Sequence, residues 1–462
     1  MWLWLTDGNL QEPRGRNQNI PGKVVMLTRE ENDRLSHVGP GTPIGALFRR
    51  YWMPAMLSWE LPEADCPPIR LRLLGEDLIA FRDTNGKVGV LDNYCPHRRA
   101  SLFFGRNEEC GLRCVYHGWK FDTEGHCVDM PSEPSESNFK DKVHITAYPA
   151  EEFGEVIWLY MGPKESVPPL PKMEWTQVPS THRGVNKIQQ ACGWLQGVEG
   201  GIDTVHSTFL HRRQAGFGIS ARDQAVKKST AATLEVEQTD FGYTYAGIRP
   251  LPDDGGNFVR GYHFIMPFYQ LRAAQLGSVI TGRGDVKPII SGHAWVPIDD
   301  ENTMVWNFTY SFSDVELSER ERLQVGSGNE MYKDIDPTNG FRSIANAGND
   351  YFIDREMQRT TNFTGIEGIN TQDRAVQESM GAVCDRTREH LGTTDRAIIM
   401  TRKIMLEASR VVEDGGDPPG LSTDIYELRA IEKILPSGVD WRTALHKEFY
   451  QKATYSPDYK SG

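Results

Sequence analysis

Cysteine is scarce in this chain, with 7 among 462 residues. Cysteines that are so few and so widely spaced do not form the disulfide framework of a small secreted protein. We therefore expect a reducing, cytoplasmic environment. Cys110 has no histidine at a matching offset and is not expected to bind a metal. The cysteines without any spacing pattern are expected to be buried free thiols: Cys66, Cys127, Cys192 and Cys384.

Long apolar runs and excess positive charge are also missing. No stretch approaches the ~20 apolar residues that span a bilayer. The opening Met1–Leu5 is short and lacks the basic residues of a signal peptide. A formal net charge of -12 argues against nucleic acid and anionic membranes as partners. It does not exclude an anionic small substrate, because a pocket can be basic on an acidic protein.

The length of the chain predicts two domains, because 462 residues exceed one typical core. Residues 1–25 are rich in Gly, Asn, Arg and Pro without periodicity, which indicates a disordered extension. The proline-rich stretch 167–171 predicts a stiff connection. We therefore place an N-terminal domain over residues 26–165 and a larger domain over residues 166–462.

The two halves differ in the secondary structure that they predict. Between residues 69 and 160, short apolar runs alternate with turn signals such as Asn85-Gly86, which is typical of antiparallel hairpins. The second half adds a helical pattern over residues 194–211 and a long amphipathic helix from about 394 to 412. The predicted fold class is therefore α+β.

Two short segments each carry a cysteine and a histidine. Cys95-Pro96-His97-Arg98 is followed by Cys114-Val115-Tyr116-His117-Gly118-Trp119, which gives C-x-H…C-x2-H. Two thiolates and two imidazoles suit an iron–sulfur cluster in which two histidines replace two cysteines on one iron. Cys95 and Cys114 would hold the inner iron, and His97 and His117 the outer one. The alternative is a structural zinc site, although zinc fingers usually pair Cys with Cys and His with His.

A second set of metal-ligand types follows at Asp203, His206 and His211, with the spacing D-x2-H-x4-H. Both imidazoles reach one side if a helix bends or ends there. Two histidines and one carboxylate on one face of an iron leave open positions for O2 and substrate. Two ordinary core histidines are the alternative, but an upstream cluster needs an acceptor for its electrons. We therefore predict a mononuclear iron with His206 and His211 as ligands.

The third iron ligand has two candidates. Asp373 heads an amphipathic segment through Val376 and Met380, which would turn the carboxylate inward. Asp350 lies in a charged segment that is more typical of a solvated face. We predict Asp373 as the ligand and keep Asp350 as the alternative.

These motifs together resemble the α subunits of Rieske non-haem iron aromatic ring-hydroxylating oxygenases, most of all the phthalate dioxygenase branch. The similarity extends from about Met26 to the C-terminal region and includes Gln372-Asp373, followed by Glu378-Ser379-Met380-Gly381. The resemblance implies an antiparallel β domain with a Rieske [2Fe-2S] cluster and a helix-grip (START-like) catalytic domain with Fe(II). It also implies a separate NADH-dependent flavin and iron–sulfur reductase, and a homotrimer or a homohexamer of stacked trimers.

The resemblance further implies a bridge between subunits, from His117 of one chain through Asp203 to His206 of the next. Asp203 would orient the imidazole by the hydrogen bonding that is common to metal-bound histidines. Many relatives carry Asn four residues before this Asp, whereas this chain has Glu199. The chain departs from the family pattern at that position.

Substrates of this branch are mostly aromatic acids. A guanidinium can hold a carboxylate in a bidentate fork, and Arg249, Arg260 and Arg272 lie in or beside predicted strands. Surface ion pairs are the alternative role for these arginines. Apolar candidates for the ring pocket, which could equally be ordinary core, are Phe264, Ile265 and Met266.

The predicted activity is the O2-dependent dihydroxylation of an aromatic carboxylate such as a phthalate or a substituted benzoate. The alternative is monooxygenation of an aromatic acid, with O-demethylation or aryl-ether cleavage, because the outcome depends on how the substrate lies. A pure electron carrier of the Rieske ferredoxin type would need neither the second domain nor the D-x2-H-x4-H motif.

Overall fold

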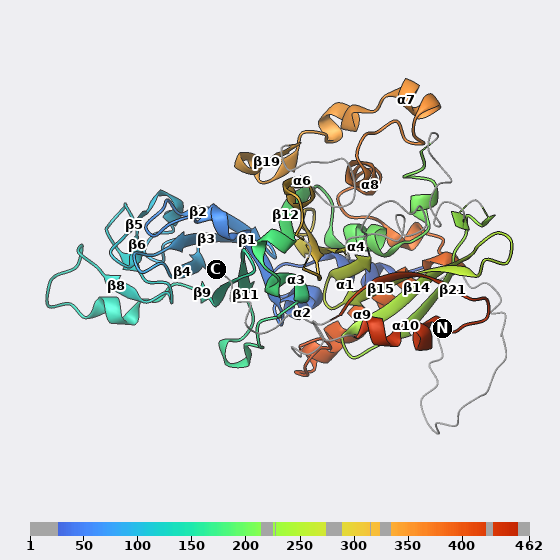
Figure 1. Ribbon diagram of the computed structural model, residues 1–462. Coiled ribbons are helices and arrows are strands. Elements are labelled where there is room, and N and C mark those ends of the chain that lie inside the picture. Colours follow the sequence, from blue (N-terminus) through green and yellow to red (C-terminus); the bar gives the residue numbers. More distant parts are fainter. Residues whose placement is uncertain are drawn as a thin grey trace.

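The computed structural model describes residues 26–213, 225–226, 228–273, 289–314, 316–323, 334–421 and 428–450. The predicted extension over residues 1–25 lies outside these ranges. Within them the strands form three small sheets in the first part of the chain and one large sheet in the second. Figure 1 shows the small sheets toward one end of the molecule and the large sheet with its helices toward the other. The predicted α+β class is confirmed.

The three small sheets are antiparallel. One consists of β1 (Trp52–Leu57), β11 (Val156–Tyr160) and β10 (Ala150–Phe153). The next consists of β2 (Ile69–Leu73), β3 (Glu76–Arg82), β4 (Val88–Asp92) and β9 (Ala147–Tyr148). The third consists of β5 (Arg106–Glu108), β6 (Gly111–Arg113), β7 (Lys120–Phe121) and β8 (Cys127–Asp129). The predicted turn at Asn85-Gly86 joins β3 to β4, and Gly86 has a φ of +83°, which glycine adopts without strain.

The large sheet belongs to the second half of the chain and is antiparallel apart from one parallel pairing of β12 with β20. Its strand order is β13 (Thr233–Gln238), β14 (Gly242–Pro250), β15 (Asn257–Ile265), β16 (Tyr269–Ala273), β17 (Ile289–Pro297), β18 (Thr303–Ser311), β12 (Arg183–Gln190), β20 (Arg342–Ser343) and β19 (Ile335–Asp336). A further strand, β21 (Ile431–Leu435), pairs with β15.

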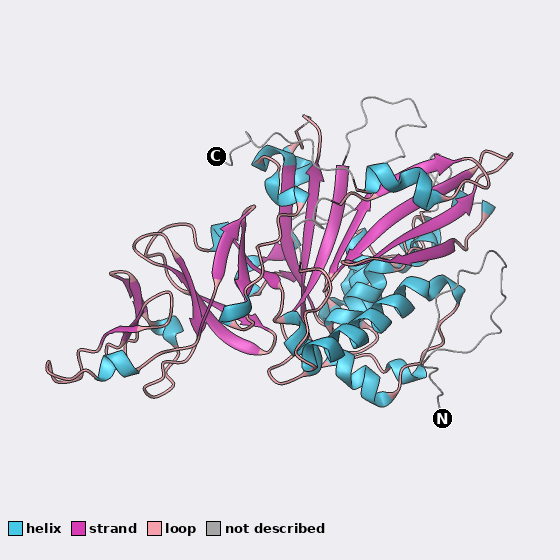
Figure 2. Ribbon diagram, turned by 90° about the horizontal axis from the view of Figure 1, so that it is seen from below, coloured by secondary structure: helices cyan, strands magenta, loops and turns pink. Residues whose placement is uncertain are grey.

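Helices cover the large sheet, most of them on one face (Figure 2). They are α1 (Arg29–Ser36), α2 (Pro43–Phe48), α3 (Glu174–Gln177), α4 (Trp194–Ile202), α6 (Glu319–Leu323), α7 (Arg355–Thr360), α8 (Ile369–Glu378), α9 (Arg396–Glu413) and α10 (Trp441–Phe449). The long helix predicted from about 394 to 412 is confirmed as α9. It packs across the sheet, where the Tyr243 hydroxyl lies 2.7 Å from that of Thr401. This is the helix-grip arrangement, and α10 covers the opposite face through Trp441 and Leu445.

The helix predicted over residues 194–211 is shorter than expected. Helix α4 ends at Ile202, and a single 3₁₀ turn, η6 (His206–Thr208), follows. The Asp203 carboxylate causes the break, because it accepts hydrogen bonds from the backbone N–H groups of Val205 and His206, at 2.7 and 3.3 Å. Such local bonds compete with the helix for the same donors.

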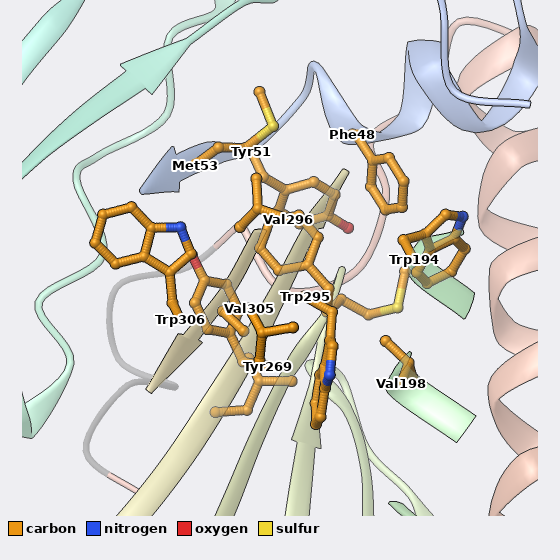
Figure 3. Close-up of a cluster of buried hydrophobic side chains, with 14 of the residues drawn as sticks. Phe48, Tyr51, Met53, Trp194, Val198, Tyr269, Trp295, Val296, Val305 and Trp306 are labelled. Atoms are coloured by element: carbon orange, nitrogen blue, oxygen red, sulfur yellow. The ribbon is translucent and has the colours of Figure 1, made fainter. Parts of the chain in front are cut away.

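The main hydrophobic core joins the first helices and β1 to the large sheet. Phe48 of α2 meets Trp194 of α4 edge to face, with ring centroids 4.9 Å apart. Figure 3 shows this cluster, with side chains labelled at Phe48, Tyr51, Met53, Trp194, Val198, Tyr269, Trp295, Val296, Val305 and Trp306. A separate, smaller cluster lies within the small sheets and includes Cys95 and Cys114. Residues that precede the Cys–His motifs therefore help to hold the large sheet in place.

All seven cysteines lie in described residues, and none forms a disulfide. Cys66, Cys127 and Cys192 are buried as predicted, whereas Cys384 is only half-buried. Among the described helices, none combines the length and the apolar character that crossing a membrane requires.

Candidate metal centres

The two Cys–His segments fold into loops of the same backbone design. In the first loop, the N–H of Cys95 donates to the carbonyl of Ala100, at 2.9 Å, and the N–H of Arg99 donates to that of Cys95, at 2.8 Å. The second loop, between β6 and β7, repeats this six-residue pattern from Cys114 to Trp119, with distances of 2.8 and 2.9 Å. Each loop therefore presents its cysteine and its histidine from a fixed turn.

The two loops place the thiols inside and the imidazoles outside. Cys95 and Cys114 are 1% and 3% exposed. The rings of His97 and His117 lie with their centroids 4.4 Å apart and their planes at 67°. His97 also stacks on the Trp119 ring at 4.4 Å, which fixes its orientation.

The chemistry of this donor set fits a [2Fe-2S] cluster. The Nδ1 atom of His117 is buried and has no hydrogen-bond partner in the described structure. Leaving such a nitrogen unpaired is costly, so a bound metal is its natural partner. The two thiols share a hydrogen bond, which lowers the pKa of Cys114 and raises that of Cys95, so the pair holds one proton between closely placed sulfur atoms that a metal can replace.

The second predicted set of ligands also comes together. One ligand atom from each of His206, His211 and Asp373 can be chosen so that all three lie within 4.8 Å of one another. Asp373 Oδ1 is 3.5 Å from His206 Nε2 and 3.2 Å from His211 Nε2. The two imidazole rings are 5.1 Å apart and nearly perpendicular, at 83°. This arrangement suits a metal bound on one face by two histidines and one carboxylate.

Asp203 lies directly behind His206. Its Oδ2 atom is 3.4 Å from His206 Nδ1, so the Nε2 atom of the same ring points toward Asp373. Desolvation opposes ionisation of Asp203, but the hydrogen bond with His206 holds its pKa below the usual value. Asp203 thus both ends α4 and orients one predicted iron ligand.

Gln372 orients the other imidazole. His211 donates from Nδ1 to Oε1 of Gln372, at 2.8 Å, while the Gln372 amide donates to the carbonyl of Ile366, also at 2.8 Å. A metal-bound histidine is commonly held through its second nitrogen in this way. The sequence drew attention to Gln372 only as the neighbour of Asp373, because nothing local connects it with His211.

Of the two candidate carboxylates, only Asp373 lies beside the imidazoles. Asp350 is exposed on η9 (Ala347–Phe352) and does not belong to the three-residue group. Although desolvation opposes ionisation, the hydrogen bond with His211 lowers the pKa of Asp373. Its position favours Asp373 as the third ligand.

The prediction of an apolar buried face for the helix that carries Asp373 was wrong. Asp373 lies in the middle of α8 and does not begin it, and Val376 and Met380 are 41% and 50% exposed. The buried face of α8 is polar instead, because it packs through hydrogen bonds: the Gln377 side chain accepts from Gln190 of β12, and the Gln377 carbonyl accepts from Gln196 of α4, at 3.1 Å. The residues of α8 on this face are Thr371, Gln372, Arg374 and Gln377.

The three arginines predicted as carboxylate anchors differ in their surroundings. Arg249 donates to the carbonyl of Thr204, at 3.3 Å, and Arg260 pairs with Glu432, at 2.6 Å. Arg272 donates from Nε to the Ser291 hydroxyl at 3.1 Å, while its buried Nη2 atom has no partner among the described residues. Desolvation and the charge of Arg260 lower the pKa of Arg272 to about 10, an effect that the nearby Asp373 opposes.

The apolar candidates for the ring pocket belong to the main core. Phe264 stacks on Tyr243 with centroids 5.0 Å apart, and its neighbours in the sequence are buried with it. Packing therefore accounts for the positions of Phe264, Ile265 and Met266.

The departure at Glu199 has a structural explanation. Glu199 is paired with two arginines, Arg386 at 3.0 Å and Arg402 at 2.6 Å, and both guanidinium groups are almost fully buried. Arg402 also pairs with Glu389 at 2.7 Å. This network ties α4 to α9 and to the segment that follows α8, close to the turn that carries Asp203.

Two family models match the chain. Residues 51–149 match the Rieske [2Fe-2S] domain, and residues 159–460 match the LigXa C-terminal domain like family. The second match covers more than half of the chain and includes the three predicted ligands of the mononuclear iron.

Curated relatives match most of the chain. The 3-chlorobenzoate-3,4-dioxygenase oxygenase subunit of Comamonas testosteroni is 39% identical over 91% of this chain and 98% of its own length. The phthalate 4,5-dioxygenase oxygenase subunit of Pseudomonas putida is 36% identical over 90% of this chain and 94% of its own length. The 5,5'-dehydrodivanillate O-demethylase oxygenase subunit of Sphingobium sp. is 32% identical over 89% of this chain and 86% of its own length.

Among solved structures, dicamba monooxygenase bound to dicamba matches with a TM-score of 0.56 at 17% identity, over 79% of this chain and 98% of that one. At this identity the likeness supports the fold alone.

Proposed function

Because the chain belongs to the Rieske non-haem iron oxygenases, as an α subunit of the phthalate dioxygenase-like branch, we propose that it dihydroxylates an aromatic carboxylate. It is an oxidoreductase with a [2Fe-2S] cluster and a mononuclear iron, and its relatives are oxygenase subunits of multicomponent systems, which implies a reductase partner. Phthalate-like and substituted benzoate-like acids are the proposed substrates. The relatives named for 3-chlorobenzoate and phthalate support this class.

The proposed division of labour follows the two donor sets. The bound iron centres supply O2 activation with electrons that originate from NADH and pass through the flavin-containing reductase. Cys95, His97, Cys114 and His117 would hold the cluster, and His206, His211 and Asp373 the mononuclear iron. With three protein ligands on one face, the remaining positions stay open to small molecules.

One observation carries the proposed substrate class, namely the position of Arg272. Its Nη2 atom is buried and has no partner among the described residues, and the charge of Asp373 acts on the guanidinium. Low solvent exposure there strengthens a charge-assisted hydrogen bond. A substrate carboxylate would satisfy that donor and compensate the buried positive charge. Arg249 and Arg260 are already engaged with Thr204 and Glu432.

Replacing Arg272 with glutamine should raise KM for benzoate-type substrates by about 30-fold, or ~2 kcal/mol, with a smaller change in kcat. Lysine at this position should give an intermediate KM, because it keeps the charge without the fork. The measurement is steady-state oxygen uptake with reductase and a panel containing phthalate and 3-chlorobenzoate. The exposed Arg359, replaced with glutamine, is the control. An unchanged KM in Arg272→Gln would remove the arginine from substrate binding.

Asp373→Ala should lose the mononuclear iron while the cluster stays intact, because a carboxylate ligand contributes both charge and one of three protein bonds. Asp350→Ala is the matched control and should keep all its iron. Iron analysis of both purified variants, beside the cluster absorption, tests the assignment. Loss of iron from the Asp350 variant alone would reverse it.

Monooxygenation is the second candidate function, with O-demethylation or aryl-ether cleavage as its outcome. The O-demethylase relative at 32% identity favours it. Turnover under ¹⁸O2 separates the two, since a dihydrodiol carries two labelled oxygen atoms, a ring-monooxygenated product carries one, and the phenol from O-demethylation carries none because its labelled oxygen leaves with formaldehyde.

We also propose that the chain acts in the cytoplasm as a homotrimer, or as a homohexamer of two stacked trimers. Within one chain, the small sheet from β5 to β8 lies at one end, and α4 and α8 lie beyond the intervening strands (Figure 1). A neighbouring subunit would bring its His117 to Asp203. The proposed domains are residues 26–165 and 166–462, although α1 and α2 of the first pack on α9 of the second.

A further inference from the structure

Two histidines outside these metal centres lie side by side on the surface of the first domain. His126 immediately precedes β8 and His144 lies shortly before β9, and the two residues pair as an isolated antiparallel bridge. Both side chains are exposed. Their ring centroids are 5.1 Å apart, with the planes at 73°.

The backbone holds this pair together. The N–H of Cys127 donates to the carbonyl of Val143, at 3.2 Å, and the N–H of Ile145 donates to that of Gly125, at 2.9 Å. These bonds flank the histidines, which makes them a non-hydrogen-bonded pair, the antiparallel position in which facing side chains come closest. The proximity of the two rings is therefore a property of the fold and does not depend on two flexible side chains meeting by chance.

A carboxylate orients one of the rings. His126 donates from Nδ1 to Oδ2 of Asp122, at 3.1 Å. The other oxygen of Asp122 accepts from the backbone N–H groups of Glu124 and His126, both at 2.9 Å, so the carboxylate is itself fixed. With its proton on Nδ1, His126 has a lone pair on Nε2, which is how carboxylates prepare histidines to bind metals.

The predicted iron site shares two features with this histidine pair: the spacing of the two rings and a fixed acceptor for the Nδ1 atom of one ring. There the rings of His206 and His211 are also 5.1 Å apart and nearly perpendicular, and Gln372 holds Nδ1 of His211. We propose that His126 and His144 form a surface site for a divalent transition-metal ion such as Cu²⁺, Ni²⁺ or Zn²⁺, for which imidazole is a suitable ligand. The nearby Glu124 carboxylate pairs with Lys87 at 2.9 Å and is therefore not counted as a ligand. Water would occupy the remaining coordination positions of the ion.

The test is a Cu²⁺ titration of the intact holoprotein with its cluster oxidised, followed by EPR spectroscopy. The wild type should bind one equivalent with nitrogen couplings from two imidazoles. His126→Gln and His144→Gln should each weaken binding at least tenfold. Asp122→Asn keeps the backbone contacts but loses the charge, and should weaken binding by about tenfold.

The exposed His37, at the C-terminal end of α1, is the matched control: changed to glutamine, it should leave the titration unchanged. Because both site histidines are exposed, neither substitution removes core packing, and an unaltered cluster spectrum verifies the fold. A double variant, His126→Gln with His144→Gln, that titrates like the wild type would overturn the proposal.

Discussion

Replacing His211 with alanine should abolish product formation while the visible spectrum of the cluster stays that of the wild type. The His211 Nε2 atom lies 3.2 Å from Asp373, and Gln372 fixes its ring, so the substitution removes one of three predicted protein ligands. The cluster loops belong to a different sheet and hydrophobic cluster and do not depend on this side chain. The measurement combines product formation, in the presence of reductase, with absorption spectroscopy on the same sample.

The exposed His390 is the control for this substitution, because its removal takes away an imidazole without touching the predicted site. His390→Ala should retain both turnover and spectrum. Turnover by His211→Ala at the wild-type rate would show that the D-x2-H-x4-H motif does not hold the catalytic iron.

Replacing Asp203 with asparagine should slow reoxidation of the reduced cluster by about 100-fold or more, with both metal centres still loaded. The asparagine oxygen can still accept from the N–H of Val205, so the end of α4 should form. What disappears is the negative charge 3.4 Å from His206, which orients the imidazole and is the proposed link to the neighbouring subunit. Stopped-flow absorption with substrate and O2 measures the rate.

Asp354 provides a matched control for the capping role of Asp203. Its carboxylate also accepts from two backbone N–H groups, those of Glu356 and Met357, at the start of α7. Asp354→Asn should therefore reoxidise at the wild-type rate. If a fully metallated Asp203→Asn protein did so as well, Asp203 would be a capping residue and nothing more.

The parts of the fold that sequence predicts well are those with local causes. The turn at Asn85-Gly86 and the helix α9 follow from turn chemistry and from the 3.6-residue period, which act over a few residues. The prediction that one helix extends to His211 failed for an equally local reason. The Asp203 side chain accepts a hydrogen bond from a backbone N–H group and ends the helix, which outweighs the apolar pattern of the sequence.

The parts that sequence does not predict depend on contacts between distant segments. Arg249, Arg260 and Arg272 are equivalent as isolated residues, and only their partners, Thr204, Glu432 and Ser291 respectively, distinguish them. The charge of Glu199, the residue that departs from the family pattern, is balanced by two arginines that lie 187 and 203 residues away in the sequence. The polar inner face of α8 likewise reflects its packing on α4 and could not be inferred from its own sequence.

Iron and acid-labile sulfide content, measured on the purified protein and on His211→Ala, tests most directly whether this chain holds both centres. We expect about three irons and about two sulfides per wild-type chain, from one [2Fe-2S] cluster and one mononuclear iron. His211→Ala should keep both sulfides and about two irons. Zinc without acid-labile sulfide in the wild type, or an iron content that His211→Ala leaves unchanged, would contradict the assignment.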